Sequence, residues 1–145
     1  MSSAVFVVDT NVLVAGLITH ANRSPVTLIL DAMLSGKLMY LLSEELLQEY
    51  RSVLLRPKLQ KLHGLTEPGV DRLLEEFTAN AMWREPNPAS PAPDRNDDHL
   101  WALLAAHPGS LLVTGDKLLQ ERPPVLRSVI SPATCVERFL ATHRS

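Results

Sequence analysis

Two aspartates follow apolar runs of the sequence, in positions where a carboxylate could take part in chemistry. The run Val5–Val14 predicts a central strand with Asp9 at its carboxyl end, because the run is apolar on both alternating faces. Asp116 ends the apolar run 110–114 in the same way, after Gly115. Ligands bind at the carboxyl edge of parallel sheets, so we expect both acids there. Burying a carboxylate costs free energy unless a partner, such as a metal ion, stabilises its charge.

A third acid is expected at this edge from a helix predicted over residues 44–55. Its apolar stripe has helical spacing and includes Tyr50 and Val53. Glu49 lies at the margin of this stripe and points toward the edge of the sheet. Glu45, further from the stripe, is the nearest alternative.

A fourth acid comes from the helix predicted over residues 94–107. Acids are favoured in the first turn of any helix by its dipole, which explains an aspartate there without a function. Helical spacing nevertheless distinguishes two of the aspartates at the start of this helix. Asp97 shares the buried face with Trp101 and Leu104, whereas Asp98 points toward the rim of the proposed site.

The remaining pattern of apolar runs and breakers predicts an α/β fold. Strands are expected over residues 5–14, 38–42, 81–83, 110–114 and 128–130. Helices are expected over residues 25–35, 44–55, 56–64, 66–80, 94–107 and 131–140. We expect a connector over residues 15–23 and an extended, proline-rich loop over residues 86–93. This order favours a three-layer α/β/α sandwich with a central parallel sheet, forming a single domain over residues 1–145.

The composition is that of a soluble globular protein, with 46% hydrophobic and 21% charged residues. No run is long enough to span a membrane and no basic leader is present, so we expect a cytoplasmic protein without a membrane partner. The net charge of −2 provides no global basic field. The single cysteine, Cys135, excludes an internal disulfide and a cysteine-rich zinc site.

Four carboxylates at one edge would repel one another and raise their pKa values. Mg²⁺ or Mn²⁺, which prefer hard oxygen ligands, would remove that conflict. Such a site suits phosphodiester hydrolysis, because the metal activates water and stabilises charge on the phosphate. Each acid alone has a simpler explanation, as a turn former or an ordinary helix acid, so the prediction depends on all four converging.

The chain resembles a PIN domain in five segments that occur in order: Val-Val-Asp-Thr-Asn-Val-Leu-Val, Ser-Glu-Glu-Leu-Leu-Gln-Glu-Tyr, Val-Leu-Leu-Arg-Pro-Lys, Asp-Arg-Asn-Asp-Asp and Val-Thr-Gly-Asp-Lys-Leu-Leu. The resemblance extends over residues 5–139. It is closest to the PIN-family toxin components of bacterial toxin–antitoxin systems, relatives of VapC-type ribonucleases.

The resemblance implies cleavage of RNA that depends on Mg²⁺ or Mn²⁺, a homodimer and an antitoxin partner. It implies that the catalytic metal ligands are Asp9, Glu49, Asp97 and Asp116. It also implies polar groups that support the metal site, at Asn11, Ser43 and Thr114, and either a further supporting group or a fifth ligand at Asp94. The chain departs from the family pattern in carrying Arg95 and Asn96 where Pro-Asp is expected.

Basic residues around these acids are candidates for contact with RNA phosphates, because such contacts need only charge and position. The best candidates are Arg56, Lys58, Lys61 and Lys117, with Arg23 and Arg51 also expected around the acids. No aromatic cluster indicates base stacking. His99 is the only histidine near the proposed site, and a surface position without function is the simpler expectation for it.

Two other functions remain open. The chain could be a catalytically weak or inactive binding module that keeps the fold and uses the acidic pocket for a partner. It could also be a phosphotransfer domain in which Asp9 accepts a phosphoryl group, although Asp-Thr-Asn lacks the second acid of the usual Asp-x-Asp pattern.

Overall fold

The sheet has five parallel strands, and the two that precede Asp9 and Asp116 are neighbours at its centre. The computed structural model describes residues 4–19, 23–85, 91–125 and 127–140. In this part of the chain the strand order is β3-β2-β1-β4-β5, and every pairing is parallel. The strands are β1 (Val5–Val8), β2 (Met39–Leu42), β3 (Met82–Trp83), β4 (Leu111–Val113) and β5 (Val129–Ile130). The prediction of a parallel sheet is confirmed.

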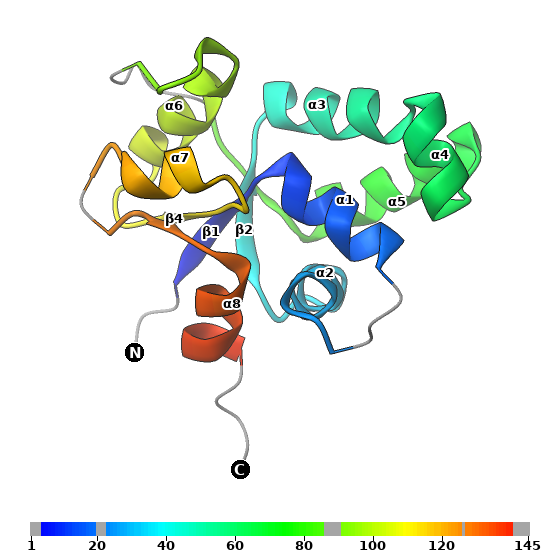
Figure 1. Ribbon diagram of the computed structural model, residues 1–145, viewed down its shortest axis with the longest axis horizontal. Helices are drawn as coiled ribbons and strands as arrows, with labels where there is room; N and C mark the ends of the chain where they lie inside the picture. The colour runs from blue at the N-terminus through cyan, green and yellow to red at the C-terminus, as the bar shows by residue number, and fades with distance from the viewer. Residues whose placement is uncertain (1–3, 20–22, 86–90, 126, 141–145) are drawn as a thin grey trace.

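Helices cover both faces of this sheet (Figure 1). The α-helices are α1 (Thr10–Ile18), α2 (Pro25–Leu34), α3 (Glu44–Leu54), α4 (Pro57–His63), α5 (Glu67–Asn80), α6 (Asp98–Ala106), α7 (Lys117–Glu121) and α8 (Pro132–Cys135). A 3₁₀ turn, η1 (Arg95–Asp97), precedes α6, and a π-helical turn, η2 (Val136–Leu140), follows α8. α2 contacts both α1 and α8, whereas α6 contacts β1 and β4. The predicted three-layer α/β/α sandwich is confirmed.

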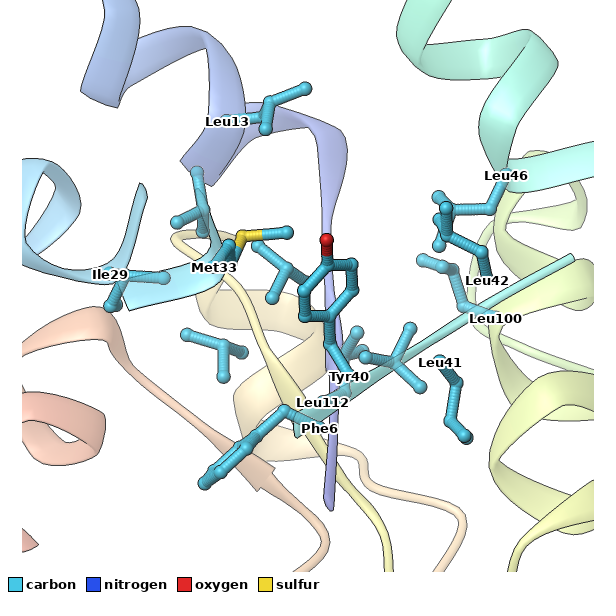
Figure 2. Packing of buried hydrophobic residues seen from close by; sticks show 14 of the residues in the cluster. Phe6, Leu13, Ile29, Met33, Tyr40, Leu41, Leu42, Leu46, Leu100 and Leu112 are labelled. Atoms are coloured by element: carbon cyan, nitrogen blue, oxygen red, sulfur yellow. The ribbon is translucent and has the colours of Figure 1, made fainter. Parts of the chain in front are cut away.

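β1 is buried along its whole length, as expected for a central strand covered on both faces. Figure 2 shows Ile29 and Met33 of α2 on one side of the central strands and Leu100 of α6 on the other. All three side chains are fully buried. Among the residues that the structure describes, no helix has the length and apolar character needed to cross a membrane.

The apolar run Val5–Val14 does not form one long strand, and the predicted connector after it is largely absent. β1 ends at Val8 and α1 begins at Thr10. Asp9 is the N-cap of α1, with extended backbone at φ −66° and ψ 150° and a carboxylate that accepts from the Thr10 amide. α1 has no pronounced polar face, so the sequence shows no helical periodicity from which this helix could be predicted.

Other elements agree with the predictions to within about two residues, with three exceptions. The short helix α7 was not predicted, although Asp116 caps it. The helix expected to begin at Asp94 is instead η1 followed by α6, which starts at Asp98. The closing helix changes from α to π-helical hydrogen bonding at Val136. Residues 86–90 of the predicted loop lie outside the described part of the chain.

Tyr50 ties α3 to the end of β1. The registered pairs between β1 and β2 are confined to the first half of β1, at Val5 and Phe6. Beyond them, the Tyr50 hydroxyl donates to the Val8 carbonyl oxygen at 2.6 Å, and Tyr50 is fully buried. This bond fixes the helix that carries Glu49 against the residue that precedes Asp9.

We predict that Tyr50→Phe lowers the free energy of unfolding by about 1–3 kcal/mol, because it leaves a buried carbonyl unpaired. It should also speed hydrogen exchange of the Asp9 amide, which donates to the Val113 carbonyl oxygen at 3.0 Å. Tyr40→Phe is the control, because the Tyr40 hydroxyl makes an equivalent buried bond to the Phe77 carbonyl oxygen, on α5. Equal exchange of the Asp9 amide in both variants would contradict this anchoring role.

Candidate active site

The four predicted acids line one pocket at the carboxyl edge of the sheet. Its volume is about 460 Å³. Asp9 follows β1, Glu49 lies on α3, Asp97 ends η1 and Asp116 precedes α7. The rest of the lining consists of Thr10, Asn11, Val14, Ala15, Ile18, Val53 and Arg56. The pocket therefore has acids on one part of its wall and aliphatic side chains of α1 and α3 on another.

Asp9 is the most buried of these acids, with 5% of its surface exposed. One carboxylate oxygen accepts from the Thr10 amide at 2.8 Å. The other accepts from the Thr114 hydroxyl at 2.8 Å and from the Asn11 amide group at 3.2 Å. Burial raises the pKa of Asp9, and the bonds from Thr114 and Thr10 oppose this rise by stabilising the anion. The carboxylate is thus fixed in orientation as well as buried.

Asn11 and Thr114 connect the end of β1 to the end of β4. The Asn11 side chain donates to the Thr114 hydroxyl at 3.2 Å and accepts from the Gly115 amide at 3.0 Å. The Thr114 hydroxyl also accepts from the Asp116 amide at 3.0 Å. Asn11 and Thr114, two of the residues predicted to support the metal site, thus fix the backbone of Asp116 relative to Asp9.

Glu49 is held at both of its carboxylate oxygens. The Thr10 hydroxyl donates to Oε2 at 2.6 Å, and Nε2 of His99 lies 2.7 Å from Oε1. The bond to His99 lowers the pKa of Glu49, although burial opposes the shift. Burial by itself lowers the pKa of His99, but the Glu49 bond and the charges of Glu49, Glu45 and Asp97 raise it above its ordinary value. Both shifts favour a charged Glu49–His99 pair.

Asp97 faces the pocket, whereas the acids on either side of it bind their own loop. The Asp98 carboxylate accepts from the Ala92 amide at 2.8 Å, and the Asp94 carboxylate accepts from the Asn96 amide at 2.9 Å. Asp97 precedes α6 but makes no capping bond with its side chain. Asp97 is directed toward the pocket by the 3₁₀ turn η1, and not by the continuous α-helix that was predicted over residues 94–107.

Asp97 is where the crowding of negative charge is most evident. Burial raises its pKa to about 6, and the charges of the other acids add to the shift. In decreasing order these acids are Asp9, Asp94, Glu49 and Asp116. A carboxylate that is buried among other negative charges binds either a proton or a cation more readily than an isolated aspartate does.

The chemistry of this donor set fits a hard divalent cation, since all four groups are carboxylates. Within the described residues, Asp97 makes no side-chain hydrogen bond and Asp116 uses one oxygen, which accepts from the Leu118 amide. Also within them, no three His, Cys, Asp or Glu side chains are grouped closely enough to hold a metal ion. Shared coordination would therefore require the carboxylates to move closer together.

Of the four residues predicted to support the metal site, only Asn11 lines the pocket; Thr114 reaches it through its bond to Asp9, whereas Ser43 and Asp94 act elsewhere. Ser43 is 1% exposed, and its hydroxyl accepts from the Leu46 amide at 3.2 Å as the N-cap of α3. It positions the helix that carries Glu49. Asp94 is exposed and caps η1, so it acts on Asp97 through its charge.

The predicted basic residues are divided between the pocket and the surface around it. Arg56 lines the pocket. Lys58 and Lys61 are exposed on the adjacent helix α4, and Lys117 is exposed at the start of α7, next to Asp116. Arg51 was expected around the acids, but its guanidinium forms ion pairs with two acids of α5 and lies outside the pocket lining.

Two residues that bond Glu49, namely Thr10 and His99, were not predicted to contribute to the site. Thr10 is the first residue of α1 and adjoins Asp9. Had this helix been predicted, the Thr10 hydroxyl would have been expected to face the site. His99 follows Asp97 by two residues, and its side chain is only 10% exposed. No sequence signal identified its partner, because Glu49 lies 50 residues away along the chain.

Comparisons with known proteins identify a family for most of the chain. The profile of the family described as PIN domain matches residues 5–118, which include all four acids. Neither a comparison with curated proteins nor one with solved structures gave a match.

We predict that Asp97→Asn stabilises the protein at neutral pH when divalent cations are removed with EDTA. The folded-state pKa of about 6 lies above the usual aspartate value of 3.8, so the folded protein binds the proton more tightly than the unfolded chain. The cost of ionising Asp97 therefore grows as the pH rises between these values and persists above them. After allowance for solvent screening, we expect a gain of roughly 1 kcal/mol at neutral pH that shrinks toward pH 4.

The measurement is chemical unfolding of the wild type and of Asp97→Asn across this pH range. Asp98→Asn is the matched control, because Asp98 binds the Ala92 amide outside the pocket. A gain for Asp97→Asn that does not change with pH would contradict the raised pKa of Asp97, which burial and the neighbouring acids produce.

Proposed function

The chain belongs to the PIN domain family, whose members are generally nucleases, and from this premise we propose that it is an endoribonuclease dependent on Mg²⁺ or Mn²⁺. The single observation that carries the proposal is the convergence of Asp9, Glu49, Asp97 and Asp116 on one pocket from four separate segments. Acids so placed repel one another, and this repulsion favours a cation between them.

The proposed ligands are these four carboxylates. Bound Mg²⁺ or Mn²⁺ would supply positive charge to the phosphate oxygens and activate the attacking water. The residues of the chain contribute position: Thr114 and Thr10 orient Asp9, and Thr10 also orients Glu49. Precise orientation of this kind is a major source of catalytic rate.

The substrate would cross the pocket toward α4. Arg56 is in the pocket lining, and the exposed Lys58, Lys61 and Lys117 lie outside it as further phosphate contacts. The aliphatic side chains of the pocket, such as Val53, provide a surface on which a ribose or a base could pack.

The biological role we propose is that of the toxin component of a type II toxin–antitoxin system in the cytoplasm. Support comes from the resemblance of the five sequence segments to such toxin components. The proposed partners are an RNA substrate, a cognate antitoxin and a second copy of the chain.

The two alternative functions predict different behaviour at Asp9. A phosphotransfer domain needs an accessible carboxylate oxygen, but Asp9 is 5% exposed and both of its oxygens accept hydrogen bonds. This disfavours an aspartyl phosphate. A binding module without catalysis would keep the pocket but cleave no RNA in the presence of Mn²⁺.

We predict that Asp9→Asn lowers the rate of RNA cleavage by about 100-fold or more, because the change removes the buried charge from the proposed metal site. EDTA should abolish cleavage by the wild type. Asp98→Asn should retain most of the activity, and the measurement is cleavage of a labelled RNA by the purified variants with Mn²⁺. Undiminished cleavage by Asp9→Asn would point to a contaminating nuclease and would contradict the proposal.

A second prediction concerns phosphate binding. Arg56→Gln should raise KM for RNA several-fold and reduce the slope of log KM against log salt concentration by roughly 0.7, as expected for the loss of one phosphate contact. Arg51→Gln is the control, since Arg51 is paired with acids of α5. An equal effect of both substitutions on KM would show that general charge, and not a contact at Arg56, governs binding.

A further inference from the structure

His99 bonds Glu49, an acid of the pocket, although His99 itself is not part of the pocket lining. Its side chain is 10% exposed, and its Nε2 atom lies 2.7 Å from Oε1 of Glu49. A carboxylate can only accept hydrogen bonds, so Nε2 is the donor in this pair. The geometry is therefore that of an imidazole that holds an acid by a charge-assisted bond.

The Nδ1 atom of His99, unpaired within the described part of the chain, indicates that a histidine is present here because of its bond to Glu49, and not because of its packing. Nδ1 is buried and has no hydrogen-bond partner among the described residues. A buried unpaired polar atom costs about 1–3 kcal/mol, a cost that an aliphatic side chain would avoid. Packing alone does not account for the imidazole, whereas its bond to Glu49 does.

The bond also joins α3, which carries Glu49, to α6, which carries His99 and begins directly after Asp97. α3 and α6 are in contact, and Figure 2 shows Leu46 of α3 and Leu100 of α6 on the same side of the central strands. Both leucines are fully buried members of the hydrophobic core, so the bond at His99 joins two helices that share this core.

We propose that His99 is a positioning residue, which fixes the Glu49 carboxylate at the pocket and sets the distance between α3 and the segment that carries Asp97. Thr10 holds the other oxygen of Glu49, so the carboxylate is clamped from α1 and from α6. This inference rests on the proposed function, because it assigns His99 to the support of the metal site.

The test compares His99→Leu with His99→Gln in the full chain. Leucine fills the buried space but removes the donor, whereas glutamine retains an amide donor that can reach Glu49. We expect His99→Leu to lower the affinity for Mn²⁺, measured by electron paramagnetic resonance, by about 10-fold or more. The kcat for RNA should fall similarly with KM within about twofold, and His99→Gln should recover a substantial part of both losses.

His63→Gln is the matched control, since Nε2 of His63 donates a comparable bond to the Leu54 carbonyl oxygen at 2.9 Å and His63 is not part of the pocket lining. It should leave the affinity for Mn²⁺ unchanged. Thermal unfolding of every variant separates loss of the fold from loss of the site.

Wild-type affinity for Mn²⁺ and wild-type kcat in His99→Leu would overturn the inference while leaving the proposed function intact. Equal losses in His99→Leu and His99→Gln would also overturn it, because they would assign the effect to ring packing. A wild-type protein that neither binds Mn²⁺ nor cleaves RNA would overturn the proposed function, and the role of His99 with it.

Discussion

The carboxylate of Asp9 is buried where β1 and β4 end side by side, and the arrangement of the pocket depends on how that charge is held. Bonds from Thr10 and Thr114 stabilise the anion from the helix and from the neighbouring strand. Because β1 and β4 pair in register, the hydroxyl of Thr114 is brought to Asp9 by the backbone itself. The same hydroxyl orients the backbone of Asp116. The central strand pair thus places two acids of the pocket with little freedom.

The other two acids come from helices, and their positions depend on packing between helices. Tyr50 holds α3 against β1, and the contact between α3 and α6 places Glu49 and Asp97 on the same pocket. Placing Asp97 here works against stability, because burial first and then the charges of the other acids raise its pKa. Such local conflict is expected at functional sites, where stability is given up for reactivity.

Much of this architecture could be predicted from the sequence, because its strands are short apolar runs that end at polar residues. β4 and the helices from α2 to α5 follow directly from such runs, capping residues and prolines. α1 could not be predicted, because it lacks a pronounced polar face and continues the apolar run of β1. The 3₁₀ turn before α6 was also missed, so Asp97 reaches the pocket for a different local reason than helical spacing suggested.

The roles of Thr10 and His99 could not be inferred from local sequence, because each depends on a partner distant along the chain. Glu49 is 39 residues from Thr10 and 50 from His99. Only the packing of α1, α3 and α6 brings these groups together.

Anomalous X-ray diffraction from crystals soaked in Mn²⁺ would reveal whether the four acids share a divalent cation. We expect a manganese peak between Asp9, Asp97 and Asp116, within reach of Glu49. Manganese bound only elsewhere on the protein, with the four carboxylates left apart, would contradict it.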